Sequence, residues 1–490
     1  MVAIAEKPFI HLIQMPYGWY VYDVNRNRVL KVDEKVFKYL YAEQNDDSEM
    51  VNNLCEETKD KVQLLREKGF LSSSHPEEIC HPMNDYLDSL LSKNIEKITL
   101  QVTRQCNLRC QYCIYSETNS DGQRTHSSDT MSWETAKKAI DFFAEHSYEE
   151  RTVNVGFYGG EPLLAFDLIE KCVAYAEDVL EGKVLSFSLT SNGTLLTPAM
   201  VAFMEEHSID LTISLDGPSE IHNKRRVFRD ESKGTFEKLM GNLEWMKRDF
   251  PNFFNSISIS AVLDPEEDFG CVDEFFKKFT AVGDRALAVI STIADDTYSD
   301  KKNLFSEEFQ PRVNYELFNV LLAVGGRFAM KNLSPIAKTQ YASIYDKFEQ
   351  KPLYQTLLKR TAPGGPCPPG KTRLFVDVFG NMFPCERVSE TADCMKIGHV
   401  NTGLNAEKAH NLLNIGALTA EECKKCFAFW NCIICSRQCA KDGCLDADTK
   451  RKSCLDSKLY VDSDLRNYIT TIELKGDFAG AYEEAVENVW

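Results

Sequence analysis

Residues 103–113 read TRQCNLRCQYC, and this stretch decides how the rest of the chain is interpreted. Its cysteines, Cys106, Cys110 and Cys113, follow the spacing C-x3-C-x2-C. Three thiolates on one tight loop can bind three irons of a [4Fe–4S] cluster and leave the fourth iron open for a substrate or cofactor. A structural zinc site needs four ligands, and no further cysteine or histidine lies nearby to complete one. The spacing therefore favours an iron–sulfur site over zinc.

The cysteine loop follows the first strand of a region in which strands and helices alternate. From Lys97 onward, the expected strands are KITLQVT, VNVGFYGG, LSFSLTSNG, DLTISLDG, SISISAVLD and ALAVIST, with helical segments between them. Repeated strand–helix units predict a parallel sheet with right-handed crossovers. We therefore expect an α/β fold, a partial (β/α)6 barrel, with functional groups at the carboxyl ends of its strands.

The regions on either side of the barrel differ from it in pattern. Before it, HLIQMPYGWYVYDV and VLKVD read as two extended segments, and helical segments follow them. After it come helical segments, and then TRLFVDVFGNMFPC, which predicts a hairpin turning at Gly380–Asn381. The expected units are a small domain at 1–75, a linker at 76–95, the barrel at 96–300, a helical bridge at 301–365, a cysteine-rich domain at 366–460 and a tail at 461–490.

Composition restricts the classes of partner and the compartment. A formal net charge of −18 disfavours binding to nucleic acid or to an anionic membrane surface. The first residues, MVAIAEKPFIHLIQ, do not have the pattern of a signal peptide, and no apolar run approaches the roughly 18 residues of a transmembrane helix. We expect a cytoplasmic protein, in which 17 cysteines are better explained by metal ligation or redox chemistry than by disulfides.

Three further motifs lie at the expected carboxyl ends of later strands. GGEP spans Gly159–Pro162, TSNG spans Thr190–Gly193 and SLDG spans Ser214–Gly217. Together with CNLRCQYC, they make the region from Lys97 to Thr292 resemble the radical S-adenosylmethionine (SAM) enzymes. The resemblance implies that the cysteine loop holds a [4Fe–4S] cluster whose open iron binds SAM. One electron then cleaves SAM, and the resulting 5′-deoxyadenosyl radical takes a hydrogen from the substrate.

The same resemblance implies roles for residues around SAM. The expected SAM contacts are Tyr112 near the adenine, Gly159, Gly160 and Glu161 at the methionyl amine, Ser191, Asn192, Ser214 and Asp216 near the ribose, and Arg226 at the carboxylate. Polar residues at strand ends can instead cap loops, and this alternative stays open for Ser214 and Arg226. Relatives often carry His-Asp where this chain has His222–Asn223, so that pair receives no role, and no general base is assigned.

Ten more cysteines lie between Cys367 and Cys454, in a region that resembles the SPASM domains, which hold auxiliary iron–sulfur clusters. By the family pattern, Cys423, Cys426, Cys432 and Cys454 would hold one auxiliary [4Fe–4S] cluster, and Cys367, Cys385 and either Cys435 or Cys439 the other. Ser436 stands where the family has a cysteine, so the second auxiliary cluster would lack a fourth protein thiolate. Zinc ligation is the alternative for the C-x2-C pair. The expected total is three clusters.

The order of N-terminal module, barrel and SPASM tail resembles maturases of ribosomally made peptides, above all those that install thioether crosslinks in cysteine-rich peptides (the ranthipeptide group). This resemblance implies a winged-helix-like recognition domain that binds the leader of a precursor peptide at a sheet edge. It also implies an electron donor such as flavodoxin or ferredoxin. The alternatives are carbon–carbon crosslinking maturases, anaerobic sulfatase maturases, which lack this N-terminal module, and a non-catalytic iron–sulfur carrier or peptide adaptor. GGEP and SLDG favour an enzyme, because a carrier needs no SAM pocket.

Overall fold

The computed structural model describes residues 7–113, 126–230, 233–279, 289–292, 306–327, 332–349 and 356–476, together with residue 329. Residues 477–490 of the expected tail and the first residues of the last expected barrel strand lie outside the described residues. No helix within the described part is both long enough and apolar enough to cross a membrane.

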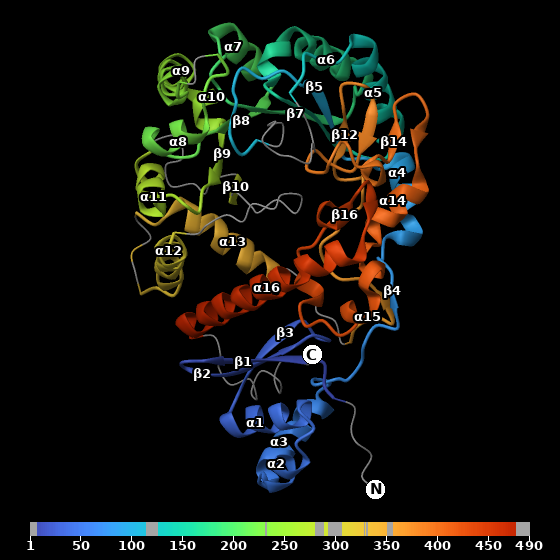
Figure 1. Ribbon diagram of the computed structural model, residues 1–490, viewed down its shortest axis with the longest axis vertical. Helices are drawn as coiled ribbons and strands as arrows, with labels where there is room; N and C mark the ends of the chain where they lie inside the picture. The colour runs from blue at the N-terminus through green and yellow to red at the C-terminus, as the bar shows by residue number, and fades with distance from the viewer. Residues whose placement is uncertain are drawn as a thin grey trace.

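The upper half of the molecule in Figure 1 is built on a parallel sheet, whose six strands are adjacent in the order in which they occur in the chain. They are β5 (Lys97–Thr103), β6 (Thr152–Gly159), β7 (Val184–Ser191), β8 (Ile209–Ser214), β9 (Ser258–Leu263) and β10 (Val289–Thr292). The helices that connect or follow them are α5 (Trp133–His146), α6 (Phe166–Val179), α7 (Pro198–Glu206), α8 (Ser219–Arg225), α9 (Phe236–Asp249), α10 (Pro251–Ser256) and α11 (Phe269–Lys278). The predicted α/β class and partial barrel are confirmed.

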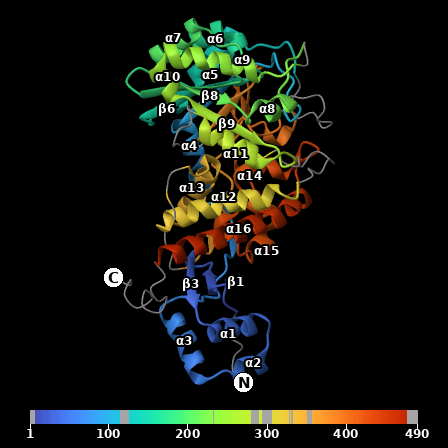
Figure 2. The ribbon, with the colours of Figure 1, turned by 90° about the vertical axis from the view of Figure 1, so that its left-hand side faces the viewer.

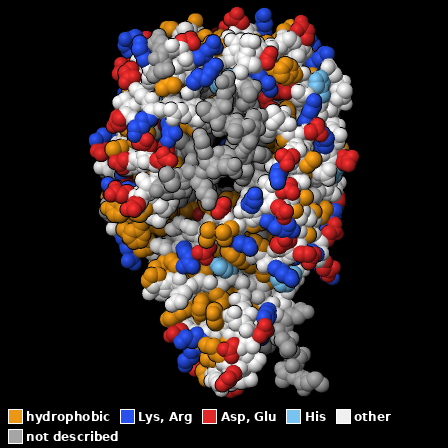
Figure 3. Space-filling view, in the orientation of Figure 1, with side chains coloured by type: hydrophobic (Ala, Val, Ile, Leu, Met, Phe, Trp, Pro, Cys, Tyr) orange, Lys and Arg blue, Asp and Glu red, His pale blue; other side chains and the backbone are white. Residues whose placement is uncertain are grey.

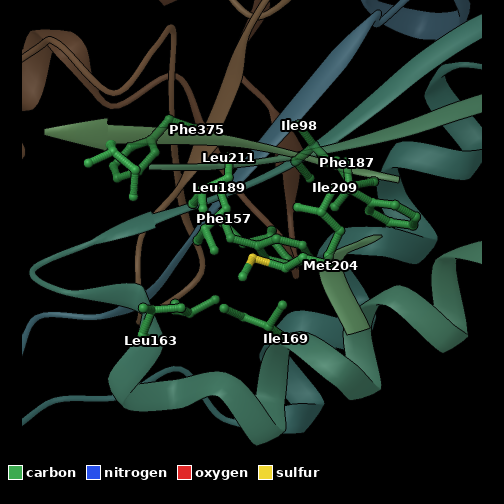
Figure 4. Close-up of a cluster of buried hydrophobic side chains, with 14 of the residues drawn as sticks. Ile98, Phe157, Leu163, Ile169, Phe187, Leu189, Met204, Ile209, Leu211 and Phe375 are labelled. Carbon is green, nitrogen blue, oxygen red and sulfur yellow. The ribbon is translucent and has the colours of Figure 1, made fainter. Parts of the chain in front are cut away.

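Alternation along the strands separates an apolar face from a polar one. Ile98, Phe187 and Leu211 point toward the helices and join the main hydrophobic core, where they meet Ile169 and Met204 (Figure 4). The side chains between them point to the opposite, inner face. That face carries Lys97, Thr99 and Gln101 on β5, Asn154, Gly156 and Tyr158 on β6, and Ser186, Ser188 and Thr190 on β7. The inner wall of the barrel is therefore rich in hydroxyl and amide groups.

The cysteine-rich region extends the barrel sheet, which the sequence did not predict. β12 (Leu374–Val376) pairs parallel with β5, and β13 (Asn381–Phe383), β14 (Gly398–His399) and β15 (Gly403–Leu404) continue antiparallel. The predicted hairpin exists, but its turn spans residues 377–380 and Asn381 already begins β13. The Asp377 carboxylate accepts hydrogen bonds from the N–H groups of Phe379 and Asn381, which fixes the turn one position earlier.

The N-terminal residues form a small sheet covered on one face by helices. β1 (Ile10–Met15), β2 (Gly18–Asp23) and β3 (Arg28–Val32) precede α1 (Glu34–Gln44), α2 (Ser48–Asn53) and α3 (Glu56–Glu67). The stretch read as one extended segment is the β1–β2 hairpin, which turns at Pro16–Tyr17. Within the described residues, β1 and β3 are both edge strands. The expected boundary between the N-terminal domain and the linker, at residue 75, stays a prediction.

The second face of the N-terminal sheet packs against α16 (Ala447–Lys475), which lies between it and the barrel in both views (Figures 1 and 2). Tyr20 and Tyr22 are buried there in one core with Val461, Leu465 and Phe429. Lys31 and Tyr20 both bind the Glu473 carboxylate at 2.6 Å. The N-terminal unit therefore shares a core with the cysteine-rich region.

The remaining elements link these parts. They are β4 (Glu78–Ile79), which pairs with β11 (Arg360–Thr361), α4 (Leu87–Lys93), α12 (Phe309–Val324), α13 (Pro335–Glu349), α14 (Ala406–Leu413), α15 (Ala420–Cys423), and the hairpin of β16 (Ala440–Lys441) and β17 (Cys444–Leu445). On the face shown in Figure 3, acidic and basic side chains are interspersed rather than separated into single-sign patches.

Candidate active site

The three cysteines of the radical loop, defined here as residues 104–113, lie directly after β5. The Leu108 N–H donates to Cys106 Sγ at 3.4 Å, and the Cys113 N–H donates to the Cys110 carbonyl at 3.1 Å. The thiols lie close enough to interact electrostatically with one another. Burial raises the pKa of Cys110 to about 12 and that of Cys106 further. A bound cation is therefore needed to hold both as thiolates near neutral pH.

Gly159 and Gly160 bring the end of β6 against the radical loop. A Cβ on Gly159 would lie 2.1 Å from the Thr103 carbonyl oxygen, and one on Gly160 would lie 2.2 Å from that of Gln105. Gly159 also has φ of +150°, which L side chains rarely adopt. The N–H groups of Gly160 and Glu161 donate to these two carbonyls at 2.9 and 2.8 Å. The glycines thus allow a backbone approach that positions the cysteines.

Glu161 joins the ends of β6 and β7. Its buried carboxylate accepts hydrogen bonds from the Ser191 hydroxyl at 2.8 Å, the Asn192 N–H at 2.8 Å and the Leu163 N–H at 3.1 Å. Burial raises its pKa, and these hydrogen bonds oppose that effect. The Ser191 hydroxyl also accepts from the Gly193 N–H. Glu161 and Ser191, both predicted to contact SAM, are therefore already engaged in holding the loop.

Asn192 connects this loop to the cysteines. Its amide donates to the side chain of Asn107 at 3.0 Å, and its oxygen accepts from the N–H and hydroxyl of Thr194. Asn107 donates in turn to the Thr194 hydroxyl at 2.9 Å. Asn107 and Thr194 were not predicted from the sequence. The sequence offered one hint of their role: Asn107 lies inside CNLRC, and Thr194 directly follows TSNG.

Tyr112 of the radical loop, which is partly exposed, forms one cluster with the buried side chains of Asp216 and Arg226. The Tyr112 hydroxyl donates to Asp216, and Arg226 donates to the two oxygens of the same carboxylate at 2.7 and 3.2 Å. The guanidinium lies 5.4 Å from the centre of the Tyr112 ring. Burial alone would raise the pKa of Asp216, but the charge and hydrogen bonds of Arg226 outweigh it and the pKa lies below its usual value. The structure brings together three predicted residues from separate segments.

His222, which received no role in the sequence analysis, supports this cluster from behind. The Asp216 N–H donates to Nδ1 at 3.3 Å, so Nε2 carries the proton and donates to the Thr235 hydroxyl at 3.0 Å. Thr235 donates onward to the Arg226 carbonyl at 3.3 Å. Burial, assisted by the nearby Arg226 charge, lowers the pKa of His222 to about 4. His222 is therefore neutral, and it fixes both Asp216 and Arg226.

Comparison with known proteins finds a family resemblance. Residues 100–279, which are less than half of the chain, match the model of the Radical SAM superfamily. The chain is 29% identical over 309 residues to an uncharacterized protein of Methanocaldococcus jannaschii, covering 63% of this chain and 89% of that one. It is 24% identical over 370 residues to a cysteine-type anaerobic sulfatase-maturating enzyme of Clostridium perfringens, covering 73% and 91%.

Other comparisons are shorter or structural. The radical SAM cyclopropyl synthase TigE of Paramaledivibacter caminithermalis is 26% identical over 194 residues, which is 37% of this chain and 41% of TigE. The solved structure of histidine-tagged anSMEcpe with bound AdoMet has a TM-score of 0.58 at 20% identity, covering 80% of this chain and 98% of that one. At this identity the structural likeness shows the fold alone.

The donor set of the radical loop fits an iron–sulfur cluster better than a single metal ion. Among the described residues, no group of three or more His, Cys, Asp or Glu side chains converges on a point where one ion would bind. In a [4Fe–4S] cluster each iron takes a separate thiolate, so the ligands need not converge. Cys106, Cys110 and Cys113 meet that requirement on one short loop, in which Cys110 is buried and the other two are partly exposed. Ser214, the remaining predicted contact, lies at the carboxyl end of β8, level with Ser260 of β9.

One set of auxiliary cysteines gathers where α15, the following loop and α16 meet. Its members are Cys423, Cys426, Cys432 and Cys454, and they lie close enough to interact electrostatically. Burial raises the pKa of Cys426 to about 11. The Lys450 ammonium donates to Cys423 Sγ at 3.3 Å, and the Ser457 hydroxyl donates to Cys432 Sγ at 3.7 Å. The structure thus brings together the four residues that the sequence grouped.

The second set gathers Cys367, Cys385 and Cys435. Burial raises the pKa of Cys385 to about 11. Cys439 lies between the two sets, since it interacts with Cys435, Cys454 and Cys432, and its thiol donates to the Cys435 carbonyl at 3.4 Å. It is fully buried. The geometry therefore favours Cys435 over Cys439 as the third member, a choice that the sequence left open.

Proposed function

We propose that this protein is a radical SAM maturase that acts on a peptide. The observation that carries the proposal is the cluster that Tyr112 of the three-cysteine loop forms with the buried pair Asp216 and Arg226. A carrier of electrons would need the thiols but not a preorganised cation and aromatic ring behind them. The similar C. perfringens protein is a sulfatase-maturating enzyme, and this supports a protein or peptide substrate.

In this proposal, Cys106, Cys110 and Cys113 hold a [4Fe–4S] cluster, and the neighbouring residues hold SAM. When bound, this pair supplies a 5′-deoxyadenosyl radical that abstracts a hydrogen atom. Asp216 fixes the Arg226 guanidinium, which presents positive charge toward the SAM carboxylate. Tyr112, held by the same Asp216, presents its ring to the adenine. Fixed orientation matters because a radical must meet one carbon–hydrogen bond and no other.

The finer proposal is thioether formation in a ribosomally made, cysteine-rich precursor. Support comes from the second auxiliary set, in which Cys367, Cys385 and Cys435 leave one ligand position of a [4Fe–4S] cluster for a substrate thiol. Cys423, Cys426, Cys432 and Cys454 would hold the other auxiliary cluster. Each crosslink joins a cysteine sulfur to a carbon and removes two hydrogen atoms from the peptide. One would go to the 5′-deoxyadenosyl radical, and the other would leave as the thiol proton and an electron that an auxiliary cluster accepts. A flavodoxin or ferredoxin would deliver the initiating electron.

The leader of the precursor would add a strand to the N-terminal sheet, at β1 or β3. Both strands have one unpaired edge among the described residues, and backbone hydrogen bonds to such an edge bind extended peptides. The N-terminal sheet packs one of its faces against α16. The edges of β1 and β3 therefore lie at fixed positions relative to the cysteine-rich region.

Sulfatase maturation is a second candidate, favoured by the 91% coverage of the C. perfringens enzyme. One experiment separates the two. The reconstituted, anaerobic enzyme is given SAM, a reductant and either a cysteine-rich peptide encoded beside its gene or a sulfatase-derived cysteine peptide, and 5′-deoxyadenosine and peptide mass are measured. Loss of two hydrogens per crosslink with loss of alkylatable thiols supports thioether formation, whereas retained thiols indicate carbon–carbon bonding. Conversion of the sulfatase peptide alone supports the second candidate, and no deoxyadenosine from cluster-replete enzyme refutes both.

A further inference from the structure

A lysine inside the barrel has no carboxylate partner among the described residues. Lys97 is the first residue of β5, and the strand alternation directs its side chain to the inner face. Its ammonium donates to the Ser188 hydroxyl at 2.9 Å. No carboxylate in the described part of the chain lies within salt-bridge distance of it. The nearest charges are Glu386, Arg373 and Asp210, and Glu386 is already bound to Arg373 at 2.5 Å.

The Lys97 side chain packs against Gly156 on the neighbouring strand. Thr99, Gly156 and Ser188 lie side by side on β5, β6 and β7. A Cβ on Gly156 would lie 3.0 Å from Thr99 Oγ1, 3.1 Å from Ser188 Oγ and 3.2 Å from Lys97 Cε. The Lys97 side chain therefore passes over Gly156 to reach Ser188, and a larger residue at position 156 would block it.

Within the described residues, one buried polar group at this place has no hydrogen-bond partner, and one partly buried cation has no bound carboxylate. The Thr99 hydroxyl is buried without a hydrogen-bond partner there. Burial lowers the pKa of Lys97. Ser188 itself donates to Asn154, and Asn154 donates to Ser186, so these groups offer Lys97 no negative charge. Asp210 lies level with Ser188 on β8, but it makes no salt bridge with Lys97 in the described part of the chain. Lys97 is partly buried, and burying a cation without a bound anion is costly, so such sites are commonly completed by a ligand.

The position suits a substrate rather than SAM. The ammonium lies level with Thr99, four residues before the end of β5, which corresponds to about 13 Å from the radical loop. Glu386 directly follows Cys385, so this part of the wall also adjoins the second auxiliary set. A molecule held here would lie between the two cysteine sites.

We propose that Lys97 and Ser188 form a carboxylate-binding subsite on the inner wall of the barrel, which anchors an acidic side chain or the terminal carboxylate of the substrate. This inference rests on the proposed peptide-maturase function for the identity of the ligand. The Lys97 ammonium supplies the positive charge, and its hydrogen bond to Ser188 orients it. Gly156 leaves room for the lysine side chain. The Thr99 hydroxyl is available as a further donor.

The test uses acetate as the probe and acetamide as its uncharged counterpart. Reconstituted holoenzyme is labelled with ¹³C at lysine Cε, and the Lys97 signal is identified by its absence in Lys97→Met. Acetate is expected to shift this signal and acetamide is not. Gly156→Ala keeps the lysine but crowds it, and should weaken acetate binding about tenfold, which corresponds to about 1.4 kcal/mol. Lys171→Met, which replaces an exposed lysine on α6, is the matched control and should bind acetate as wild type does.

Equal shifts with acetate and acetamide, or no shift with either, would overturn the proposal. N-acetylglutamine and N-acetylglutamic acid α-amide then distinguish a main-chain carboxylate from a side-chain one, because each carries only one of the two. Deoxyadenosine release by wild type is measured separately. Absence of that release removes the proposed function while leaving the acetate result to decide the subsite.

Discussion

The radical loop and the second auxiliary set both bring cysteines together, but the first takes them from one short segment and the second from distant segments. Cys106, Cys110 and Cys113 lie within eight residues of one loop, so the spacing alone brings them together. The second auxiliary set draws Cys367, Cys385 and Cys435 from three separate segments, and only the fold makes them neighbours. A local site is readable from spacing, whereas a distributed one depends on how strands and loops are placed.

Replacing a radical-loop cysteine should have the largest effect. Cys110→Ala removes one of the three thiolates of the proposed [4Fe–4S] cluster, so SAM cleavage should fall by about a thousandfold or more, equivalent to about 4 kcal/mol or more in the barrier. Deoxyadenosine release and iron content measure this. Cys172→Ala, which removes a buried thiol on α6 outside the site, is the control. Near-normal cleavage by Cys110→Ala would show that the local site is not the radical site.

The distributed site is tested by comparing two neighbouring cysteines. Cys435→Ala should lose the iron of one auxiliary cluster, since Cys435 lies with Cys367 and Cys385. Cys439→Ala should keep its iron and lose only packing, because that thiol is fully buried and donates to a backbone carbonyl. Iron analysis and Mössbauer spectra of the two variants decide between them. The reverse result would place Cys439 in the second auxiliary set.

The histidine behind the radical loop makes stability depend on pH. The pKa of His222 is lowered from 6.5 to about 4 by burial. The unfolded chain therefore takes up this proton first, and stability is lost as pH falls from about 6.5 toward 4, by on the order of 3 kcal/mol in total. His222→Gln should remove this part of the pH dependence. Thermal unfolding of both proteins between neutral and mildly acidic pH is the measurement, and parallel curves would contradict the assignment.

Particular residues show how far sequence reasoning reached. Strand alternation and the loop motifs were sufficient for the barrel and for the residues that meet at its carboxyl edge. They could not show that Glu161 and Ser191 bind each other, because a polar residue at a strand end serves a loop or a ligand with the same pattern. His222 was missed because its role depends on contacts with Asp216 and Thr235, which come from different segments. The shared core of Tyr20 and Phe429 joins residues about four hundred positions apart, beyond the reach of any local pattern.

The smallest expected effect concerns the attachment of the N-terminal unit. Lys31 and Tyr20 both bind Glu473, but the Lys31 and Glu473 side chains are partly exposed, so Lys31→Met should cost no more than about 1 kcal/mol of stability. Tyr20→Phe, which loses only the hydroxyl, should cost about as much, while removal of its buried ring in Tyr20→Ala should cost about 3 kcal/mol or more. Thermal unfolding of the holoenzyme measures all three. A Lys31→Met cost equal to that of Tyr20→Ala would mean that charge, and not the shared apolar core, holds the unit in place.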